Sequence, residues 1–195
     1  MQSLYLNSHQ DYSNLQLKDV VLEKAEREDI TLRLSVLSKV VIKECIIVNF
    51  GLIKSQIEKS DFSNSELTNC YFKGTEITGS KTTGISFIDG IFKGVSFLDN
   101  KMDLANFCQA NLNDVIFKSC LLVGSNFQGA KLKNVRFLDC DLSDVDFSQA
   151  EMEKVDLRES KIVGVKIDGV NFNKLTVTPE QAIYMASLLG LDIKY

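Results

Sequence analysis

The chain has 195 residues, of which 45% are hydrophobic and 25% charged, with a formal net charge of -4. A chain of this length and composition can bury its own core, which excludes the disordered and collagen-like classes. A mildly acidic protein has no basic field for phosphates, so we expect no direct binding of nucleic acid. The apolar runs fall far short of the roughly 20 residues that span a bilayer, and no charged leader precedes an apolar stretch. We therefore expect a cytoplasmic protein without membrane contact.

The first eleven residues precede the region in which a regular pattern begins. Near the N-terminus, between residues 34 and 53, six apolar residues stand at positions that the pattern described below assigns to the outside. We expect either that residues 1–11 cover this apolar patch or that the patch is a contact surface. Its members are Leu34, Val36, Val41, Ile46, Val48 and Ile53.

A repeat of five residues organises the chain from residue 12 to residue 174. Every fifth position from Tyr12 to Phe172 is Phe, Leu, Ile, Met or Tyr, with Arg27 and Thr82 as the exceptions. The residue two positions earlier is mostly small or compact. A period of five matches neither the 3.6 of a helix nor the 2 of a flat strand. A short extended segment followed by a corner explains it, and stacked coils of such units can bury both residues of each pair.

Three units show the pattern most clearly: Ala105-Asn106-Phe107, Ala110-Asn111-Leu112 and Val145-Asp146-Phe147. They resemble the motif of the pentapeptide-repeat family, Ala-Asp/Asn-Leu/Phe followed by two variable residues. The resemblance covers about residues 12–174. It implies an all-β solenoid, a right-handed quadrilateral β-helix of about eight coils with four units in each coil and a coil spacing of about 4.8 Å.

With four units per coil, the outward charges divide unevenly among the four sides. We number the sides from the units 10–14, 15–19, 20–24 and 25–29. The first side is net +4, the second and third are each -1, and the fourth has seven acidic against two basic residues, net -5. The acidic residues of the fourth side are Glu26, Glu28, Asp29, Glu66, Asp89, Asp146 and Asp168.

Two interpretations of the acidic fourth side stay open. A soluble rod needs charged sides, and chance makes some more acidic than others. Alternatively, the side binds a cationic groove of a partner, with Glu66, Asp89, Asp146 and Asp168 as the contacts. A smaller apolar group on the third side, Leu104, Leu121 and Val123, is a competing contact surface.

The period stops after Phe172, and residues 175–195 form a separate C-terminal element. Thr178 as cap, Pro179 at the first helical position and Gln181 in a capping box predict a helix that ends at Gly190. Its apolar arc is wide, because Ala182, Ile183, Ala186 and Leu189 share one face and two further apolar residues extend it. We expect this element to cover the open end of the β-helix and to join a second copy through Met185, Leu188, Leu191 and Ile193.

The same C-terminal sequence is similar to that of pentapeptide proteins of the Qnr and MfpA type. That resemblance implies an end-to-end homodimer that mimics duplex DNA, binds a type II topoisomerase (DNA gyrase or topoisomerase IV) and protects it from quinolones or peptide toxins. The chain departs from that type in two respects. The five-residue repeat continues without insertions, which leaves no room for projecting loops, and the net charge is less negative. The alternative is an interaction scaffold for an unrelated protein partner.

An enzyme is not expected. Catalysis needs converging groups in a concave site, which a straight rod with a filled interior does not offer. His9, the single histidine, lies before the repeat, so no triad can form within one chain. The five cysteines form no CxxC pair, and no nucleotide-binding glycine motif occurs. We therefore expect no catalytic residues, no metal and no cofactor.

Overall fold

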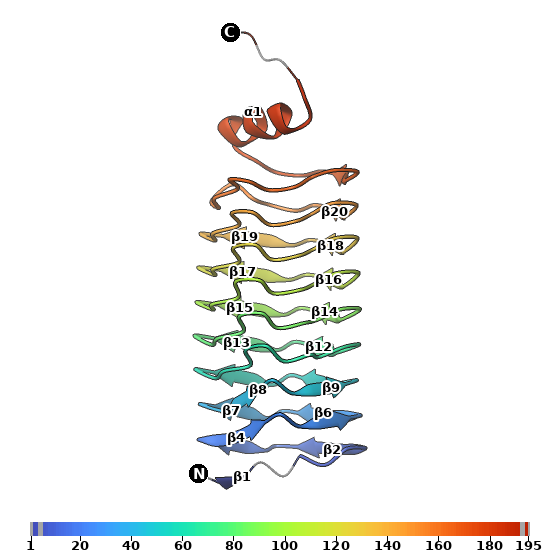
Figure 1. Cartoon of the computed structure of the whole chain (residues 1–195), viewed down its shortest axis with the longest axis vertical. Coiled ribbons are helices and arrows are strands. Elements are labelled where there is room, and N and C mark those ends of the chain that lie inside the picture. Colours follow the sequence, from blue (N-terminus) through green and yellow to red (C-terminus); the bar gives the residue numbers. More distant parts are fainter. Residues whose placement is uncertain (1, 4–5, 192–193, 195) are drawn as a thin grey trace.

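The structure, a computed structural model, describes residues 2–3, 6–191 and 194. The chain winds into a parallel β-solenoid of about eight turns, and one short helix lies across its C-terminal end (Figure 1). The predicted four-sided β-helix with a single closing helix is confirmed. No helix among the described residues is long and apolar enough to cross a membrane.

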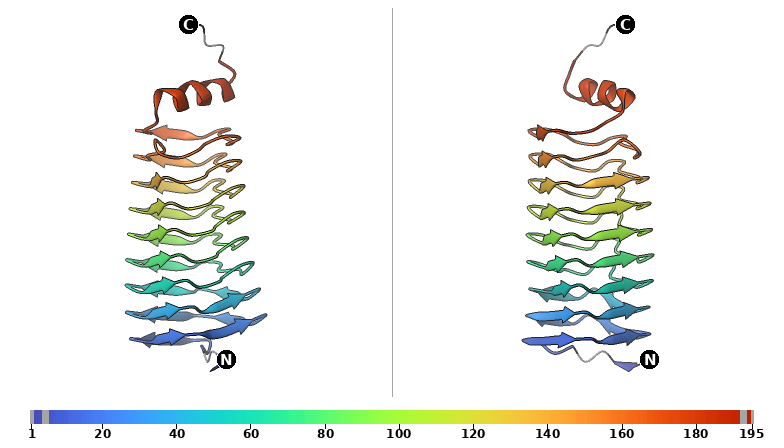
Figure 2. Two further views of the ribbon diagram at one scale, coloured as in Figure 1. Left: turned by 90° about the vertical axis from the view of Figure 1, so that its left-hand side faces the viewer. Right: turned by 180° about the vertical axis from the view of Figure 1, so that it is seen from behind.

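Two sides of the solenoid are continuous parallel sheets, seen as flat stacks of strands in Figure 2. The first side has nine strands: β2 (Gln10–Ser13), β6 (Ile30–Arg33), β10 (Gly51–Ile53), β12 (Tyr71–Lys73), β14 (Ile91–Lys93), β16 (Asn111–Asn113), β18 (Lys131–Lys133), β20 (Glu151–Glu153) and β21 (Asn171–Asn173). The second side has seven: β3 (Gln16–Lys18), β7 (Val36–Ser38), β11 (Gln56–Glu58), β13 (Glu76–Thr78), β15 (Ser96–Leu98), β17 (Ile116–Lys118) and β19 (Arg136–Leu138).

The other two sides have regular strands only near the N-terminus. The third side contains β1 (Gln2–Ser3), β4 (Val20–Glu23) and β8 (Val41–Lys43), and the fourth contains β5 (Glu26–Glu28) and β9 (Ile46–Val48). Farther along, both sides continue as single bridges between residues twenty apart, such as Asp61 with Lys81 and Glu66 with Ser86. The twenty-residue register therefore holds on all four sides.

The inward ladders form one continuous core. Phenylalanines dominate its middle: Phe97, Phe117 and Phe137 stack with ring centroids 4.9 Å apart, and Phe107 stacks on Phe127 at 4.7 Å. Such regular stacking follows from identical side chains repeated at the coil spacing. Only glycine fits at position 90 beside these rings, because a Cβ on Gly90 would lie within 3 Å of the Phe92 ring and the Cys70 sulfur.

Two polar side chains at inward positions, the buried Asn100 and the half-buried Arg27, bond to a neighbouring coil. The Asn100 amide donates to the Ile77 carbonyl and its oxygen accepts from the Ser80 N–H, both at 2.7 Å. Arg27 donates through Nε to the Leu6 carbonyl at 2.9 Å. Leu6 itself is buried, so the described residues before the repeat help to close the N-terminal end.

All five cysteines are free, and none forms a disulfide. Cys120 and Cys140 are stacked neighbours whose thiols interact, and the hydrogen bond with Cys140 together with burial raises the pKa of Cys120. Burial likewise raises the pKa of Cys70. The Cys70 and Cys120 thiols therefore stay protonated and act as small core residues, as expected for apolar surroundings.

Candidate protein-interaction surfaces

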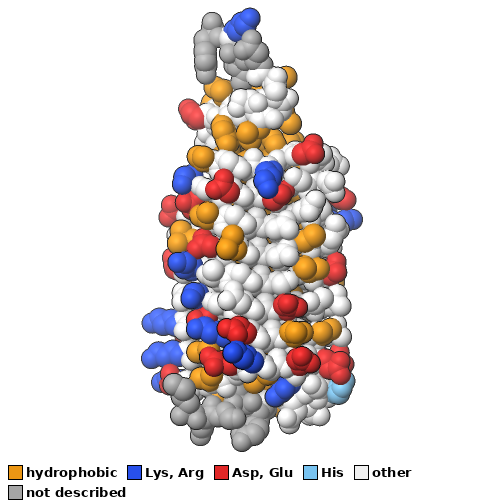
Figure 3. All heavy atoms as spheres, in the orientation of Figure 1, with side chains coloured by type: hydrophobic (Ala, Val, Ile, Leu, Met, Phe, Trp, Pro, Cys, Tyr) orange, Lys and Arg blue, Asp and Glu red, His pale blue; other side chains and the backbone are white. Residues whose placement is uncertain are grey.

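The acidic fourth side is a straight face with unevenly placed carboxylates. Glu66, Asp89 and Asp168 are exposed and form no ion pair within the described part of the chain. Between Asp89 and Asp146 the outward positions are neutral, with asparagine at 106 and 126. Figure 3 accordingly shows acidic, basic and apolar side chains interspersed on the visible face, without one continuous acidic strip.

Asp146 differs from the other three predicted contacts because its carboxylate forms an ion pair within the protomer. The carboxylate lies 3.4 Å from the Lys166 ammonium and accepts a hydrogen bond from the Ser148 N–H at 2.9 Å. Partial burial acts to raise the pKa of Asp146, but the contacts from Ser148 and Lys166 outweigh it and lower the pKa. Asp146 therefore stabilises its corner and its neighbouring coil, and it contributes little free charge to the side.

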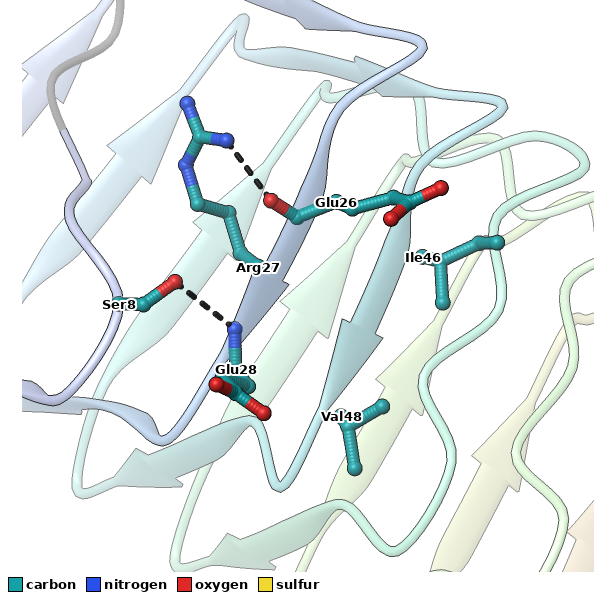
Figure 4. Close-up of a pocket in the computed structure, with 6 residues that line it drawn as sticks. All are labelled: Ser8, Glu26, Arg27, Glu28, Ile46 and Val48. Atoms are coloured by element: carbon teal, nitrogen blue, oxygen red, sulfur yellow. Dashed lines mark hydrogen bonds between the residues drawn. The ribbon is translucent and has the colours of Figure 1, made fainter.

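A pocket lies at the N-terminal end of the fourth side (Figure 4). Its volume is about 360 Å³, and its lining residues are Ser8, Glu26, Arg27, Glu28, Ile46 and Val48. The Arg27 guanidinium donates to the Glu26 carbonyl, and the Ser8 hydroxyl accepts from the Glu28 N–H. His9 lies 3.1 Å from the Glu28 carboxylate and 2.9 Å from that of Asp29.

The apolar patch near the N-terminus is not covered throughout by the described residues before the repeat. Leu34 and Ile46 are exposed, whereas the other four members are half-buried. Residues 1, 4 and 5 lie outside the described residues, so the structure addresses the expectation for segment 1–11 only through residues 2–3 and 6–11. Those residues contribute Leu6 to the core and leave Ile46 open to solvent.

The third-side apolar group combines exposure with a leucine at a left-handed corner. Leu104 is 64% exposed and Leu121 46% exposed, with the half-buried Val123 between them. Leu104 also occupies a corner with φ of 59°, in the left-handed region that Asn, Asp and Gly accept more readily. An exposed leucine in this conformation does not stabilise the fold, which makes Leu104 a candidate contact residue.

Helix α1 (Pro179–Leu188) has the predicted N-terminal cap: Thr178 and Gln181 form a reciprocal capping box. The face that packs against the solenoid is not the face shared by Ala182, Ile183 and Leu189. Gln181 and Met185 are buried and Tyr184 half-buried, whereas Ala182, Ile183 and Leu189 face solvent. The apolar arc expected from the sequence is therefore mostly exposed, and of its members only Met185 is buried against the solenoid.

This orientation lets polar side chains of the helix bond the backbone groups of the last coil, which have no further coil to pair with. Gln181 donates through Nε2 to the carbonyls of Leu157 at 2.7 Å and Ser160 at 2.9 Å. The Tyr184 hydroxyl accepts from the Gly164 N–H at 2.7 Å. In earlier coils the equivalent N–H groups donate to the next coil, as Asp144 does to the Val163 carbonyl. Unpaired buried backbone groups are costly, so these bonds outweigh apolar area in orienting the helix.

The four predicted dimer contacts have different surroundings. Met185 is only 7% exposed and belongs to the core, so it is a part of the end cap in this protomer. Leu188 and Leu191 are 42% and 61% exposed. Ile193 lies outside the described residues. The exposed apolar surface at this end also includes Ile183 and Leu189, which were not among the predicted dimer contacts.

Replacing Gln181 with alanine is expected to lower the free energy of unfolding by about 1–3 kcal/mol, since it leaves buried carbonyls without a donor. Amide hydrogen exchange should accelerate most in the last coil, near Gly164 and Val165. Gln128→Ala, an exposed glutamine of the fourth side, is the control and should change neither quantity. Unchanged exchange in the Gln181→Ala protein would contradict the capping role.

The geometry defines a solenoid scaffold with long flat faces. The described residues form no enclosed reaction centre. Among them, no group of three His, Cys, Asp or Glu side chains could hold a metal ion. A family model described as "Pentapeptide repeat region" matches residues 90–172. Residues 90–172 are therefore similar to the pentapeptide-repeat family, in agreement with the sequence pattern.

Two solved structures similar to the chain are those of QnrB1 and HetL. Trypsin-treated QnrB1, a plasmid-mediated fluoroquinolone resistance protein, is 15% identical, with 94% of this chain and 99% of that chain covered and a TM-score of 0.48. HetL from the cyanobacterium Nostoc sp. strain PCC 7120, involved in heterocyst differentiation regulation, is 14% identical, with coverage of 86% and 91% and a TM-score of 0.42. The comparison with curated proteins finds no match.

Proposed function

We propose that this protein is a non-enzymatic, cytoplasmic binding protein whose fourth side imitates the charge of duplex DNA. Its partner in this proposal is a type II topoisomerase, DNA gyrase or topoisomerase IV, which it protects from quinolones or peptide toxins. The net charge of -5 on one straight side is the observation that supports the proposal. A groove that binds phosphates is lined with Lys and Arg and attracts other suitably spaced anions.

The contacts in this proposal are the exposed carboxylates Glu66, Asp89 and Asp168, with Asp146 in a secondary role because of its pairing with Lys166. The exposed leucines at the C-terminal end support a homodimer, since apolar side chains there would be buried by a second copy. Two protomers joined in this way would carry an acidic side on each arm of a longer rod.

Reversing Glu66 and Asp89 to lysine is expected to weaken binding to purified gyrase about tenfold or more, because both repulsion and lost attraction act at the partner's cationic groove. Supercoiling assays with a quinolone or a peptide poison should then show loss of protection. Lysine is compatible with the left-handed corner of Asp89, since Lys54 and Lys59 occupy equivalent corners. The fold should therefore be retained, which circular dichroism would verify.

The matched control is Glu76→Lys with Asp99→Lys, an equal charge change on the second side, where Asp99 also occupies a left-handed corner. It should leave protection unchanged at moderate ionic strength, where exposed charges are screened beyond about 10 Å. If the wild-type protein gives no protection, the topoisomerase proposal is rejected. If the Glu66 and Asp89 variant protects fully, the acidic side is only a solvated face.

The second candidate function is a scaffold for an unrelated protein partner. The specific observation in its favour is the exposed third-side group of Leu104, Leu121 and Val123, together with the left-handed backbone of Leu104. In that case, polar substitution of Leu104 and Leu121 would reduce partner binding, and the fourth-side variant would not.

A further inference from the structure

A group of three lysines stands on the first side, away from the acidic face. Lys73 and Lys93 are directly opposite each other in the pairing of β12 with β14. Lys54 lies at the corner that follows β10, one coil nearer the N-terminus. We call Lys54, Lys73 and Lys93 the lysine cluster.

The outer members of the lysine cluster lean toward the coil that holds Lys73. The Cγ atom of Lys54 lies 3.7 Å from the point that a Cβ on Gly74 would occupy, so its stem covers that glycine. Lys93 leans in the opposite direction, with its ammonium 6.0 Å from the centre of the Tyr71 ring. Three positive charges therefore gather around one coil.

The cluster lacks a counter-charge. None of its three ammonium groups forms an ion pair with another described residue. Farther along the same side, lysines are neutralised. Lys133, in register with Lys73 and Lys93, lies 3.2 Å from the Glu153 carboxylate, and Lys131 on the same strand lies 3.5 Å from that of Glu151. Like charges on adjacent strands repel, so an anionic ligand would find an unsatisfied positive potential here.

Apolar surface accompanies these charges. Ile91 is 38% exposed and Tyr71 half-buried, and both lie on the same strands as Lys93 and Lys73. At Gly94, the corner after β14, a Cβ would meet nothing within 4 Å, so the face is open there. A phosphate backbone offers nothing to match an isoleucine and a tyrosine ring, whereas a protein segment offers both acidic and apolar side chains.

We propose that the lysine cluster, with Tyr71 and Ile91, is a docking site for an extended acidic segment of a protein partner that also carries an apolar side chain. The cluster spans three coils, a length of roughly 10 Å, which corresponds to about three or four extended residues. Carboxylates of the segment pair with Lys54, Lys73 and Lys93, and its apolar residue packs on Ile91 and Tyr71. This surface is independent of the acidic fourth side.

The test uses the full-length protein and a fluorescein-labelled peptide, Asp-Glu-Phe-Asp-Asp-Leu-Glu, followed by fluorescence anisotropy. The wild-type protein should bind it, and the double variant Lys73→Gln with Lys93→Gln should bind about tenfold more weakly. The matched control, Lys131→Gln with Lys133→Gln, removes the same charge from ion-paired positions of the same side and should change the affinity less than about twofold. Ile91→Ser should also weaken binding.

Three results would overturn the proposal: no binding of the peptide by the wild-type protein, equal losses in both double variants, or equal binding of a peptide in which Phe and Leu are replaced by Ser. Parallel measurements with a short DNA duplex and with phosphatidylserine vesicles distinguish an acidic protein segment from other anionic ligands. Lysine-dependent binding of either one, without binding of the peptide, would assign the cluster to nucleic acid or membrane and reject the protein segment. Gyrase protection is not a readout here, so this outcome is separate from that of the proposed function.

Discussion

Phe107→Ala is expected to destabilise the protein by about 3–5 kcal/mol, the range typical of large-to-small substitutions at a fully buried aromatic position. Phe107 is fully buried and contacts phenylalanines of its own coil and of both neighbouring coils, with ring centroids 5.0 Å from Phe87 and 4.7 Å from Phe127. Because each coil packs only on its neighbours, a cavity here weakens both interfaces of the coil. Denaturant unfolding followed by circular dichroism would measure the change.

Leu104→Asn in the same coil is the control. Leu104 is mostly exposed and has a left-handed backbone, which asparagine accepts better than leucine. Its stability should be unchanged or slightly higher. A loss below about 1 kcal/mol for Phe107→Ala would show that the phenylalanine stack can close over the cavity, against the close packing inferred here.

Replacing Leu188 and Leu191 together with aspartate is expected to halve the mass measured by sedimentation, if these exposed leucines join two copies as proposed. Both are open to solvent in the protomer, so charged substitutes do not disturb the solenoid. Two carboxylates would dissociate an interface formed mainly by a few apolar side chains, because burying each unpaired charge costs several kcal/mol of binding free energy.

Met185→Asp gives the contrasting result, because Met185 belongs to the core of the protomer. That variant should lose protection of the last coil in hydrogen exchange, whatever the oligomeric state. Ser187→Asp, an exposed position on α1, is the control for added charge and should keep the wild-type mass. A monomeric wild-type protein would refute the dimer and leave α1 as an end cap alone.

Most of the fold could be predicted from the sequence, because each inward residue repeats with an unbroken period. A period of five with four units per turn places Phe72 opposite Phe92 and Phe97 opposite Phe117, as the strand pairing has them. Contacts between coils depend only on residues twenty apart, so local pattern and tertiary structure coincide. The two exceptions in the ladder, Arg27 and Thr82, did not disturb the register.

The tertiary structure decided what lies at the ends and on the outside. Hydrogen bonds of Gln181 and Tyr184 to the last coil orient α1, although its apolar pattern favoured another face, because unpaired carbonyls at a buried end cost more than exposed leucines. On the outside, the repeat assigns a side to each charge but does not say how it is paired. Asp146 is neutralised by Lys166, whereas Lys54 and Lys93 lean toward Lys73. The period of the sequence determines the coil and side on which a residue lies. Only the conformation of its long side chain determines which charged group that side chain contacts.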